Sequence, residues 1–176
     1  PITFWSFDEA LKMIGKKNAF PPLGLLTIAG MMPERFDLRL VYMNVEDISP
    51  EDFLWADVVI TSSMIIHWES LEDVIRRCNV AGVPILNGGP LPTQYHEEIE
   101  GDAVFYLGEG ENGFIDVVDE MIAHPDQVVR HTIDRRGEFR DLINTPVPRW
   151  DLIDFNNYSN MVVQTTRGCP ESCTVC

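Results

Sequence analysis

The spacing of apolar and polar residues predicts short strands and helices that alternate along the first two thirds of the chain. Runs of apolar and β-branched residues, bounded by polar or glycine-rich turns, predict strands at 37–44, 57–64, 83–87 and 103–107. Apolar residues at helical spacing predict helices at 21–32, 68–80 and 114–124. Between the last two strands we expect only a short polar connection.

This alternation favours one parallel sheet covered by helices on both faces. The runs at 58–61 and 104–107 are almost entirely apolar, which is typical of buried central strands. Arg39 interrupts the run at 37–44 and places that strand nearer an edge. We therefore predict an α/β fold with a doubly wound, Rossmann-like or flavodoxin-like parallel sheet.

The periodic pattern weakens after about His124. Residues 128–133 predict a short strand. Residues 135–160 contain prolines and no clear periodicity, and they predict a linker that wraps over a surface. Residues 161–168 (MVVQTTRG) predict one more strand, which runs directly into a cysteine-rich end.

Charge and cysteine content narrow the classes of function. The 28 acidic residues outnumber the 13 basic ones, and the net charge of −15 repels nucleic acids and anionic lipid surfaces. We expect no membrane span either, because no apolar run approaches the roughly 20 residues that a span needs. Three of the 4 cysteines lie in the last eight residues, and Cys78 belongs to a helical pattern. This distribution fits a metal site and one buried thiol in a reducing cytoplasm.

The carboxyl ends of the predicted strands, where ligands of open parallel sheets bind, are rich in small residues. Glycines and hydroxyl residues let a large ligand approach the backbone. The candidate cofactor-binding residues here are Ser62, Ser63, Met64, Gly88, Gly89, Pro90, Gly108, Glu109, Gly110 and Glu111. Trp5, in the aromatic stretch TFWSF, is either part of a hydrophobic plug or a wall for a flat cofactor.

Gly108–Gly113 has the form G-x-G-x-x-G but is a weak dinucleotide signature. It belongs to the last strand–helix unit, and its glutamates repel a pyrophosphate. A glycine turn with glutamates near a helix N-terminus explains it as well. A phosphoacceptor receiver domain is excluded because Thr61–Ser63 supplies no carboxylate. His67 is expected to cap a helix or stay solvated rather than bind a metal.

Cys169, Cys173 and Cys176 form a C-x3-C-x2-C motif. A structural zinc site needs a fourth ligand nearby, whereas a [4Fe–4S] cluster on three thiolates keeps one iron open. The stretch TTRGCPESCTVC resembles the cluster loop of radical S-adenosylmethionine enzymes. The resemblance implies that the three cysteines bind a [4Fe–4S] cluster whose open iron chelates S-adenosylmethionine. Glu171 and Val175 replace residues that are usual in that loop.

Upstream stretches resemble the N-terminal cobalamin-binding domain of one radical S-adenosylmethionine subclass: TFWSFDEALKMIGKKNAFPPLGLLTIAGMMP, LRLVYMNVEDI, WADVVITSSM, GVPILNGGP and LGEGE. TPVPRWDLIDFNNY is similar to the interdomain connector of that subclass. The resemblance implies a cobalamin-binding-like domain (1–126), a connector (127–160) and the start of a truncated barrel with its cluster loop (161–176).

Two short elements resemble the S-x-L and G-G elements that line the nucleotide-tail pocket of cobalamin domains. They are Ser62-Ser63-Met64 and Gly88-Gly89. The D-x-H-x-x-G element is absent. The resemblance therefore implies that cobalamin binds with its base off and without a histidine ligand.

The resemblance implies the N-terminal part of a cytoplasmic, cobalamin-dependent radical S-adenosylmethionine enzyme, a methyltransferase. Its partners are then small-molecule cofactors and the remainder of the barrel, and the chain by itself is expected to be inactive. The family also places a central strand ahead of Pro1, which this sequence lacks. Two other interpretations stay open: an accessory cap module that holds no cobalamin, and a zinc or redox protein that uses the cysteine motif directly.

Overall fold

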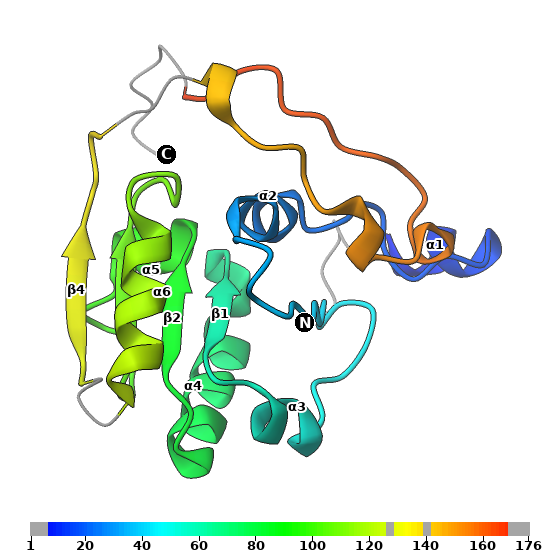
Figure 1. The fold of residues 1–176 in the computed structure, drawn as a ribbon. Coiled ribbons are helices and arrows are strands. Elements are labelled where there is room, and N and C mark those ends of the chain that lie inside the picture. The colour runs from blue at the N-terminus through cyan, green and yellow to red at the C-terminus, as the bar shows by residue number, and fades with distance from the viewer. Residues whose placement is uncertain (1–6, 126–128, 139–141, 169–176) are drawn as a thin grey trace.

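Within the described part of the chain, four parallel strands form a sheet in the order β1-β2-β3-β4 (Figure 1). The computed structural model describes residues 7–125, 129–138 and 142–168. A helix connects each strand to the next, and the predicted parallel α/β fold is confirmed. The strands are β1 (Val59–Ser62), β2 (Ile85–Gly88), β3 (Val104–Leu107) and β4 (His131–Asp134), and the connecting helices are α4 (Trp68–Ala81), α5 (Pro90–Tyr95) and α6 (Phe114–Ala123).

Short helices lie before and after the sheet in the sequence. Those before it are α1 (Asp8–Met13), α2 (Leu23–Met31) and α3 (Pro50–Trp55). The remaining elements are 3-10 turns: η2 (Ile65–His67), η4 (Leu142–Asn144), η5 (Trp150–Leu152) and η6 (Phe155–Asn157). Among the described residues, no helix combines the length and the apolar character that crossing a membrane requires.

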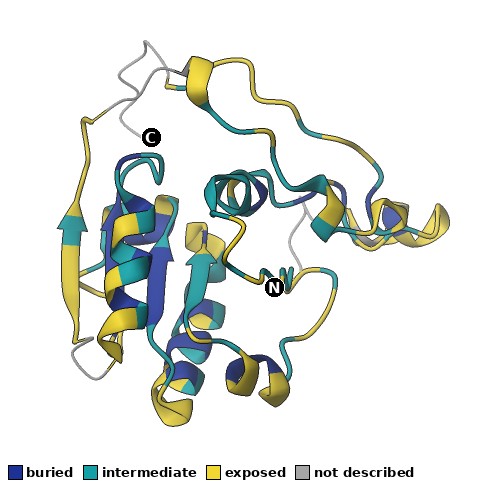
Figure 2. Cartoon of the chain, in the orientation of Figure 1, coloured by how far each residue is buried: buried dark blue, intermediate teal, exposed yellow. Residues whose placement is uncertain are grey.

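Alternating side chains of the strands divide the core into two layers. On one face Ile85, Phe105 and Leu107 pack with α3, α4 and α5. On the other face Leu86 and Tyr106 pack with α6, and α2 adds partly buried side chains. Figure 2 shows that β2 and β3 are buried between these layers, whereas β4 is mostly exposed at one edge.

Helix α4 shows how the sequence pattern becomes structure. Leu71, Val74, Ile75 and Cys78 recur at helical spacing, and all four are buried. Gly82 follows the helix with a φ of 71°, a left-handed conformation that glycine adopts without strain. Cys78 is a free core thiol, and burial raises its pKa to about 12.

Two of the predicted strands are wrong. Residues 37–44 form no ladder, and the Arg39 guanidinium instead lies 2.8 Å from Asp52 Oδ1 at the start of α3. Residues 161–168 are not a strand either. Alternating polarity reports half-burial, but a strand also needs a hydrogen-bonding neighbour, which the described residues do not supply here.

The positions of β1 and α5 also differ from expectation. β1 was predicted to be a central strand, but among the described residues it pairs with β2 alone, and its side chains are partly buried or exposed. Helix α5 stands where a short polar connection was expected. Its two prolines, Pro90 and Pro92, obscure the helical pattern, although proline fits the first turn of a helix because its missing N–H has no partner there.

The connector lies against the N-terminal part of the chain. The backbone N–H groups of Lys17 and Asn18 donate to the Asn157 carbonyl at 2.9 and 3.0 Å. The Arg149 N–H donates to the Leu26 carbonyl of α2 at 3.0 Å. Figure 1 shows that residues 142–168 pass beyond the carboxyl ends of the strands. The connector therefore runs along the edge of the sheet where a ligand is expected.

Candidate functional site

The carboxyl ends of β1 and β2 meet at one edge of the sheet. Ser62 and Gly88 are register partners in the parallel ladder. The Ser63 N–H donates to the Gly88 carbonyl at 3.3 Å, and the Leu91 N–H donates to the Ser63 carbonyl at 3.0 Å. The loop after β1 is thus tied to the first turn of α5, which begins at Pro90. The structure therefore brings the candidate residues of these two strand ends together.

Gly89 closes this edge tightly. Its φ is 92°, and a Cβ there would lie 2.8 Å from Ser62 Oγ and 2.9 Å from Ser63 N. Only glycine fits such a position without displacing the backbone. At Gly88 a Cβ would meet its nearest atoms at 3.8 Å, which is an ordinary contact. The protein itself therefore has room for a side chain at Gly88. A glycine at such a position is expected where a ligand approaches the backbone.

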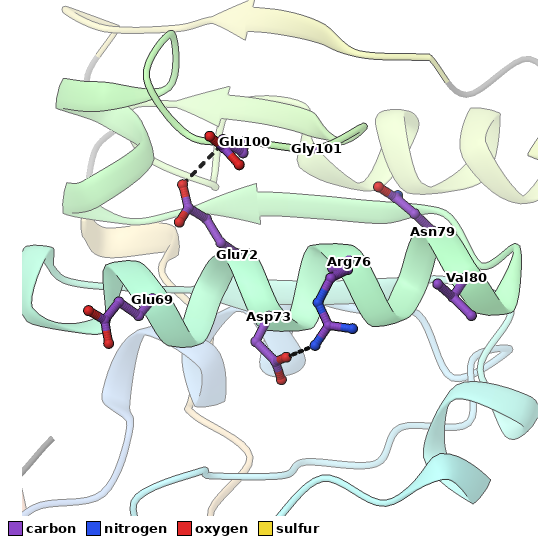
Figure 3. A pocket seen from close by; sticks show the side chains of 8 residues that line it. All are labelled: Glu69, Glu72, Asp73, Arg76, Asn79, Val80, Glu100 and Gly101. Atoms are coloured by element: carbon purple, nitrogen blue, oxygen red, sulfur yellow. Dashed lines mark hydrogen bonds and ion pairs between the residues drawn. The ribbon is translucent and has the colours of Figure 1, made fainter.

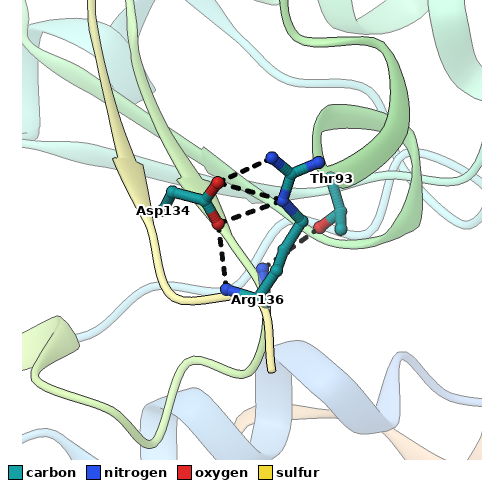
Figure 4. Close-up of polar contacts among 4 residues, drawn as sticks. Thr93, Asp134 and Arg136 are labelled. Atoms are coloured by element: carbon teal, nitrogen blue, oxygen red, sulfur yellow. Dashed lines mark hydrogen bonds and ion pairs between the residues drawn. The ribbon is translucent and has the colours of Figure 1, made fainter. Parts of the chain in front are cut away.

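Thr93 joins the ends of β2 and β3, and sequence analysis missed it. Its Oγ1 donates to the Gly89 carbonyl at 2.8 Å. The same oxygen accepts the Gly108 N–H at 3.3 Å, which is the contact of Thr93 drawn in Figure 4. Gly108 has a φ of 104°, and a Cβ there would lie 2.8 Å from the Arg135 carbonyl oxygen. The signal in the sequence was the spacing of four residues between Gly89 and Thr93. This spacing brings the two residues together only in a helix, and α5 was not predicted as one.

Figure 4 also shows how β4 ends. The Arg136 backbone N–H donates to Asp134 Oδ1 at 3.0 Å, and its Nη2 donates to Oδ2 at 2.6 Å. Hydrogen bonds from the Arg136 side chain and backbone hold the pKa of Asp134 down at about 2. This carboxylate is satisfied within its own turn, so we assign it to the structure of that turn rather than to the ligand edge.

Two polar groups lie buried beneath the edge that β1 and β2 form. Asn87 is fully buried, and its Oδ1 accepts a hydrogen bond from Thr61 Oγ1 at 2.5 Å. Its Nδ2 has no hydrogen-bond partner among the described residues, and neither does Ser63 Oγ. Buried polar groups are nearly always hydrogen-bonded in folded proteins, because an unpaired one costs about 1–3 kcal/mol. These two atoms are therefore candidates for ligand contacts.

The loop after β1 exposes three consecutive apolar side chains. The exposed fractions of Met64, Ile65 and Ile66 are 55%, 54% and 49%. His67 caps this loop, because its Nδ1 accepts the Met64 N–H at 3.2 Å, and burial lowers the pKa of His67. An exposed apolar patch beside small residues suits a ligand with a broad apolar face.

The loop after β3 is occupied by protein contacts instead. Arg167 Nη1 lies 3.1 Å from Glu109 Oε2, and Arg167 Nη2 donates to Glu111 Oε1. The hydrogen bond with Glu111 is the main cause that raises the pKa of Arg167. A Cβ at Gly110 would collide with Ile28 of α2. The structure thus places the two glutamates against an arginine that sequence analysis did not single out.

A shallow hollow of about 630 Å³ lies along the outer side of α4, away from the strand ends (Figure 3). Half of its lining residues are acidic: the lining consists of Glu69, Glu72, Asp73, Arg76, Asn79, Val80, Glu100 and Gly101. Glu72 Oε1 already accepts hydrogen bonds from Trp68 Nε1 at 2.9 Å and from the Glu100 N–H at 3.1 Å. We therefore place the candidate site at the strand ends, where two buried polar atoms lack partners among the residues that the structure describes.

Four predicted site residues lie outside the described residues: Trp5, Cys169, Cys173 and Cys176. Within the residues that the structure does describe, no group of three or more His, Cys, Asp or Glu side chains is arranged to hold a metal ion. The cysteine motif therefore stays a prediction.

The parallel sheet, the glycines at its strand ends and the apolar loop after β1 define a cofactor-binding module of the doubly wound α/β class. The family model of the B12 binding domain matches residues 16–118, more than half of the chain. The chain belongs to the B12-binding domain family. The predicted relationship to cobalamin-binding domains is thereby confirmed.

Several curated relatives are methyltransferases by name. An uncharacterized methyltransferase of Synechocystis is 35% identical over 178 residues, which cover 100% of this chain and 32% of the relative. The hopanoid C-2 methylase of Rhodopseudomonas palustris is 30% identical over 179 residues, 99% of this chain and 33% of the relative. The bacteriochlorophyllide d C-12(1)-methyltransferase of Chlorobaculum tepidum is 24% identical, over 96% of this chain and 38% of the relative.

The chain thus spans about a third of the length of these relatives. No solved structure matched the chain.

Proposed function

We propose that this chain binds cobalamin at the edge formed by the carboxyl ends of β1 and β2, as part of a methyltransferase. One observation carries the proposal: Ser63 Oγ and Asn87 Nδ2 are buried without described partners at the edge where Met64–Ile66 expose apolar side chains. Cobalamin has a broad ring and many amide groups, so it matches both features. Membership of the B12-binding family and the names of the relatives support this choice.

Each part of the edge has a distinct role in this proposal. Ser62 and Ser63, together with Gly88–Pro90, line the pocket for the nucleotide tail, and Asn87 donates a hydrogen bond from below. Met64–Ile66 pack against the ring. His67 uses Nδ1 to cap its own loop, which supports binding without a histidine on the cobalt. Gly108 and Gly110 border the site, and Glu109 and Glu111 are held by Arg167.

The protein contributes binding and orientation to the reaction. When bound, cobalamin supplies the capacity to carry a methyl group between a donor and an acceptor. The fixed backbone at Gly89 and the Thr93 hydroxyl keep the strand ends in register, so the ligand meets a preformed surface.

We further propose that the whole protein is a cytoplasmic radical S-adenosylmethionine enzyme. Three thiolates from Cys169, Cys173 and Cys176 are the donor set that holds a [4Fe–4S] cluster with one open iron, where S-adenosylmethionine binds. On this proposal residues 1–126 form the cobalamin domain, 127–160 the connector, and 161–176 the start of the barrel. The chain without the rest of the barrel is then inactive.

Titration with hydroxocobalamin tests the first proposal. The intact protein is mixed with the cofactor and desalted, and its ultraviolet–visible spectrum is recorded. We expect retained cobalamin with a base-off spectrum, and a weaker hold in Ser63→Ala. Ser159→Ala in the connector is the matched control and should bind as the wild type does, because it removes hydrogen bonds of the connector: one to the Ala19 carbonyl and one from Asn160 Nδ2. Absence of retained cobalamin in the intact wild-type protein would favour the cap-module interpretation.

Metal analysis tests the second proposal. Anaerobic reconstitution should give a brown protein that absorbs near roughly 400 nm, and Cys173→Ala should lose that absorption. Stoichiometric zinc without this absorption would support the zinc interpretation instead.

A further inference from the structure

We propose that Arg167 is a positioning residue that docks the segment before the cysteine motif onto the loop after β3. Arg167 precedes Cys169 by two residues in the sequence. Its partners, Glu109 and Glu111, belong to the stretch that resembles a phosphate-binding loop. In this proposal the two glutamates are the receptor for an arginine of the same chain rather than ligands of a cofactor.

The contact is protected and specific. The exposed fractions of the side chains are 18% for Arg167, 23% for Glu109 and 12% for Glu111. A guanidinium carries its N–H groups in a fixed plane, so one arginine can donate to two carboxylates at once, which lysine cannot match in geometry. Fully exposed ion pairs contribute little to stability. This pair is partly buried, so water and salt screen it less.

The loop that receives Arg167 is itself held in place. The Tyr106 hydroxyl donates to the Asn112 carbonyl at 2.5 Å, and Asn112 Nδ2 donates to the Glu138 carbonyl at 2.5 Å. Helix α2 packs closely over Gly110. The backbone of the loop that carries the two glutamates is therefore held by contacts that do not involve Arg167.

The segment that Arg167 anchors has few other attachments. Residues 161–168 form no ladder, and Met161 and Val163 are exposed by 53% and 79%. The Arg167 side chain is mostly buried in a stretch whose other residues are mostly exposed. Docking of this side chain therefore fixes the direction in which the chain enters the cysteine motif. The docking rests on the described contacts, and only its relevance to a cluster rests on the proposed function.

Hydrogen exchange measured by mass spectrometry on the intact protein tests the role. In Arg167→Met we expect at least a tenfold faster amide exchange in the peptide that covers 108–113, with β2 unchanged. Arg149→Met is the matched control, because Arg149 forms an exposed pair with Asp151 at 2.8 Å within the connector. The control should leave exchange in this peptide as it is. Arg167→Lys should keep only part of the protection, since lysine keeps the positive charge but cannot donate to both carboxylates from one planar group.

A charge exchange separates docking from general stability. Arg167→Glu should likewise speed exchange at 108–113, and the added change Glu111→Arg should restore much of the protection there. If Arg167→Met also loosens β2, this rescue becomes the deciding measurement. Unchanged exchange at 108–113 in Arg167→Met, or no recovery in the charge exchange, would overturn the proposal. Retention of cobalamin is measured separately, so a failure of cobalamin binding does not count against the docking.

Discussion

The loops after β1 and β3 leave the same edge of the same sheet, yet they use their side chains in opposite ways. The β1 loop exposes three apolar residues and lies over two buried polar atoms without described partners. The polar groups of the β3 loop instead form hydrogen bonds within the protein, which involve Tyr106, Asn112 and Arg167. The β1 loop thus leaves exposed surface for the proposed ligand, whereas the β3 loop contacts another segment of the chain.

The difference shows that glycine-rich strand ends do not share one function. Gly89 is required by backbone geometry between β1 and α5, whereas Gly110 makes room for α2. A motif such as G-x-G-x-x-G is therefore informative only together with the partners that its loop acquires in the fold. Each prediction below tests whether ligand binding and chain docking are separated in this way.

The largest effect is expected at Gly89. Gly89→Ala places a Cβ against the Ser63 backbone at a positive φ, so unfolding should become easier by roughly 1–3 kcal/mol, and cobalamin retention should be lost. Gly88→Ala is the control, since its Cβ makes ordinary contacts, and its stability should change by less than about 1 kcal/mol. Urea unfolding measures both variants. Equal stability of the two would contradict the tight closure described here.

The buried polar pair gives the next effect. The double change Thr61→Val with Asn87→Leu removes a buried donor and its acceptor together, so stability should change little. Affinity for cobalamin should fall by roughly tenfold or more, because the amide proposed to donate to the ligand is lost. Equilibrium titration and thermal unfolding are to be compared on the same sample. A variant that binds as the wild type does would show that Asn87 serves the core alone.

The exposed apolar loop should give a smaller effect. Ile65→Asn is expected to weaken cobalamin binding by roughly threefold to tenfold, because about half of this side chain is free to pack on a ligand. Val80→Asn on α4 is the matched control, since Val80 is 83% exposed and far from the strand ends. Equal losses in both variants would indicate a general effect of surface polarity and not a site.

The smallest effect is a dependence on pH at the β1 loop. Burial lowers the pKa of His67, so the folded state releases its proton more readily than the unfolded state, whose pKa is about 6.5. The stabilising contribution of neutral His67 is therefore present above that value and is lost as the pH falls through the lowered folded pKa. A protonated ring cannot accept the Met64 N–H.

The rate of hydrogen exchange at 63–67, corrected for intrinsic rates, should accordingly rise about threefold when the pH falls from about 7.5 to about 5. Exchange at 108–113 should not follow. His67→Asn should flatten the response, and a full response in that variant would assign the effect to another group.

Much of the fold follows from local periodicity. The apolar positions of α4 and the fully apolar run of β3 were sufficient to place both elements. The alternation at 37–44 was misleading, because it records half-burial and contains no information about a pairing neighbour. Helix α5 escaped notice because Pro90 and Pro92 resemble a loop, although proline is compatible with a first turn.

The site was predictable only in part. Ser62, Ser63 and Gly88 could be placed at one edge because the carboxyl ends of parallel strands coincide. The contact of Arg167 with Glu109 and Glu111 joins residues 58 and 56 positions apart, and no local pattern encodes such a pair. That Asn87 Nδ2 lacks a hydrogen-bond partner among the described residues likewise depends on every neighbour around it.

The contact between residues 16–20 and the connector has a consequence for the order of folding in the cell. Ser159 and Ala19 are joined across 140 positions of the chain. At a translation rate of about 5–20 residues per second, the earlier segment waits for roughly 7–28 seconds before its partner leaves the ribosome. The layers around β2 and β3 can pack during that interval. Residues 16–20 are expected to form their contacts with the connector last, when synthesis has already reached the cysteine motif.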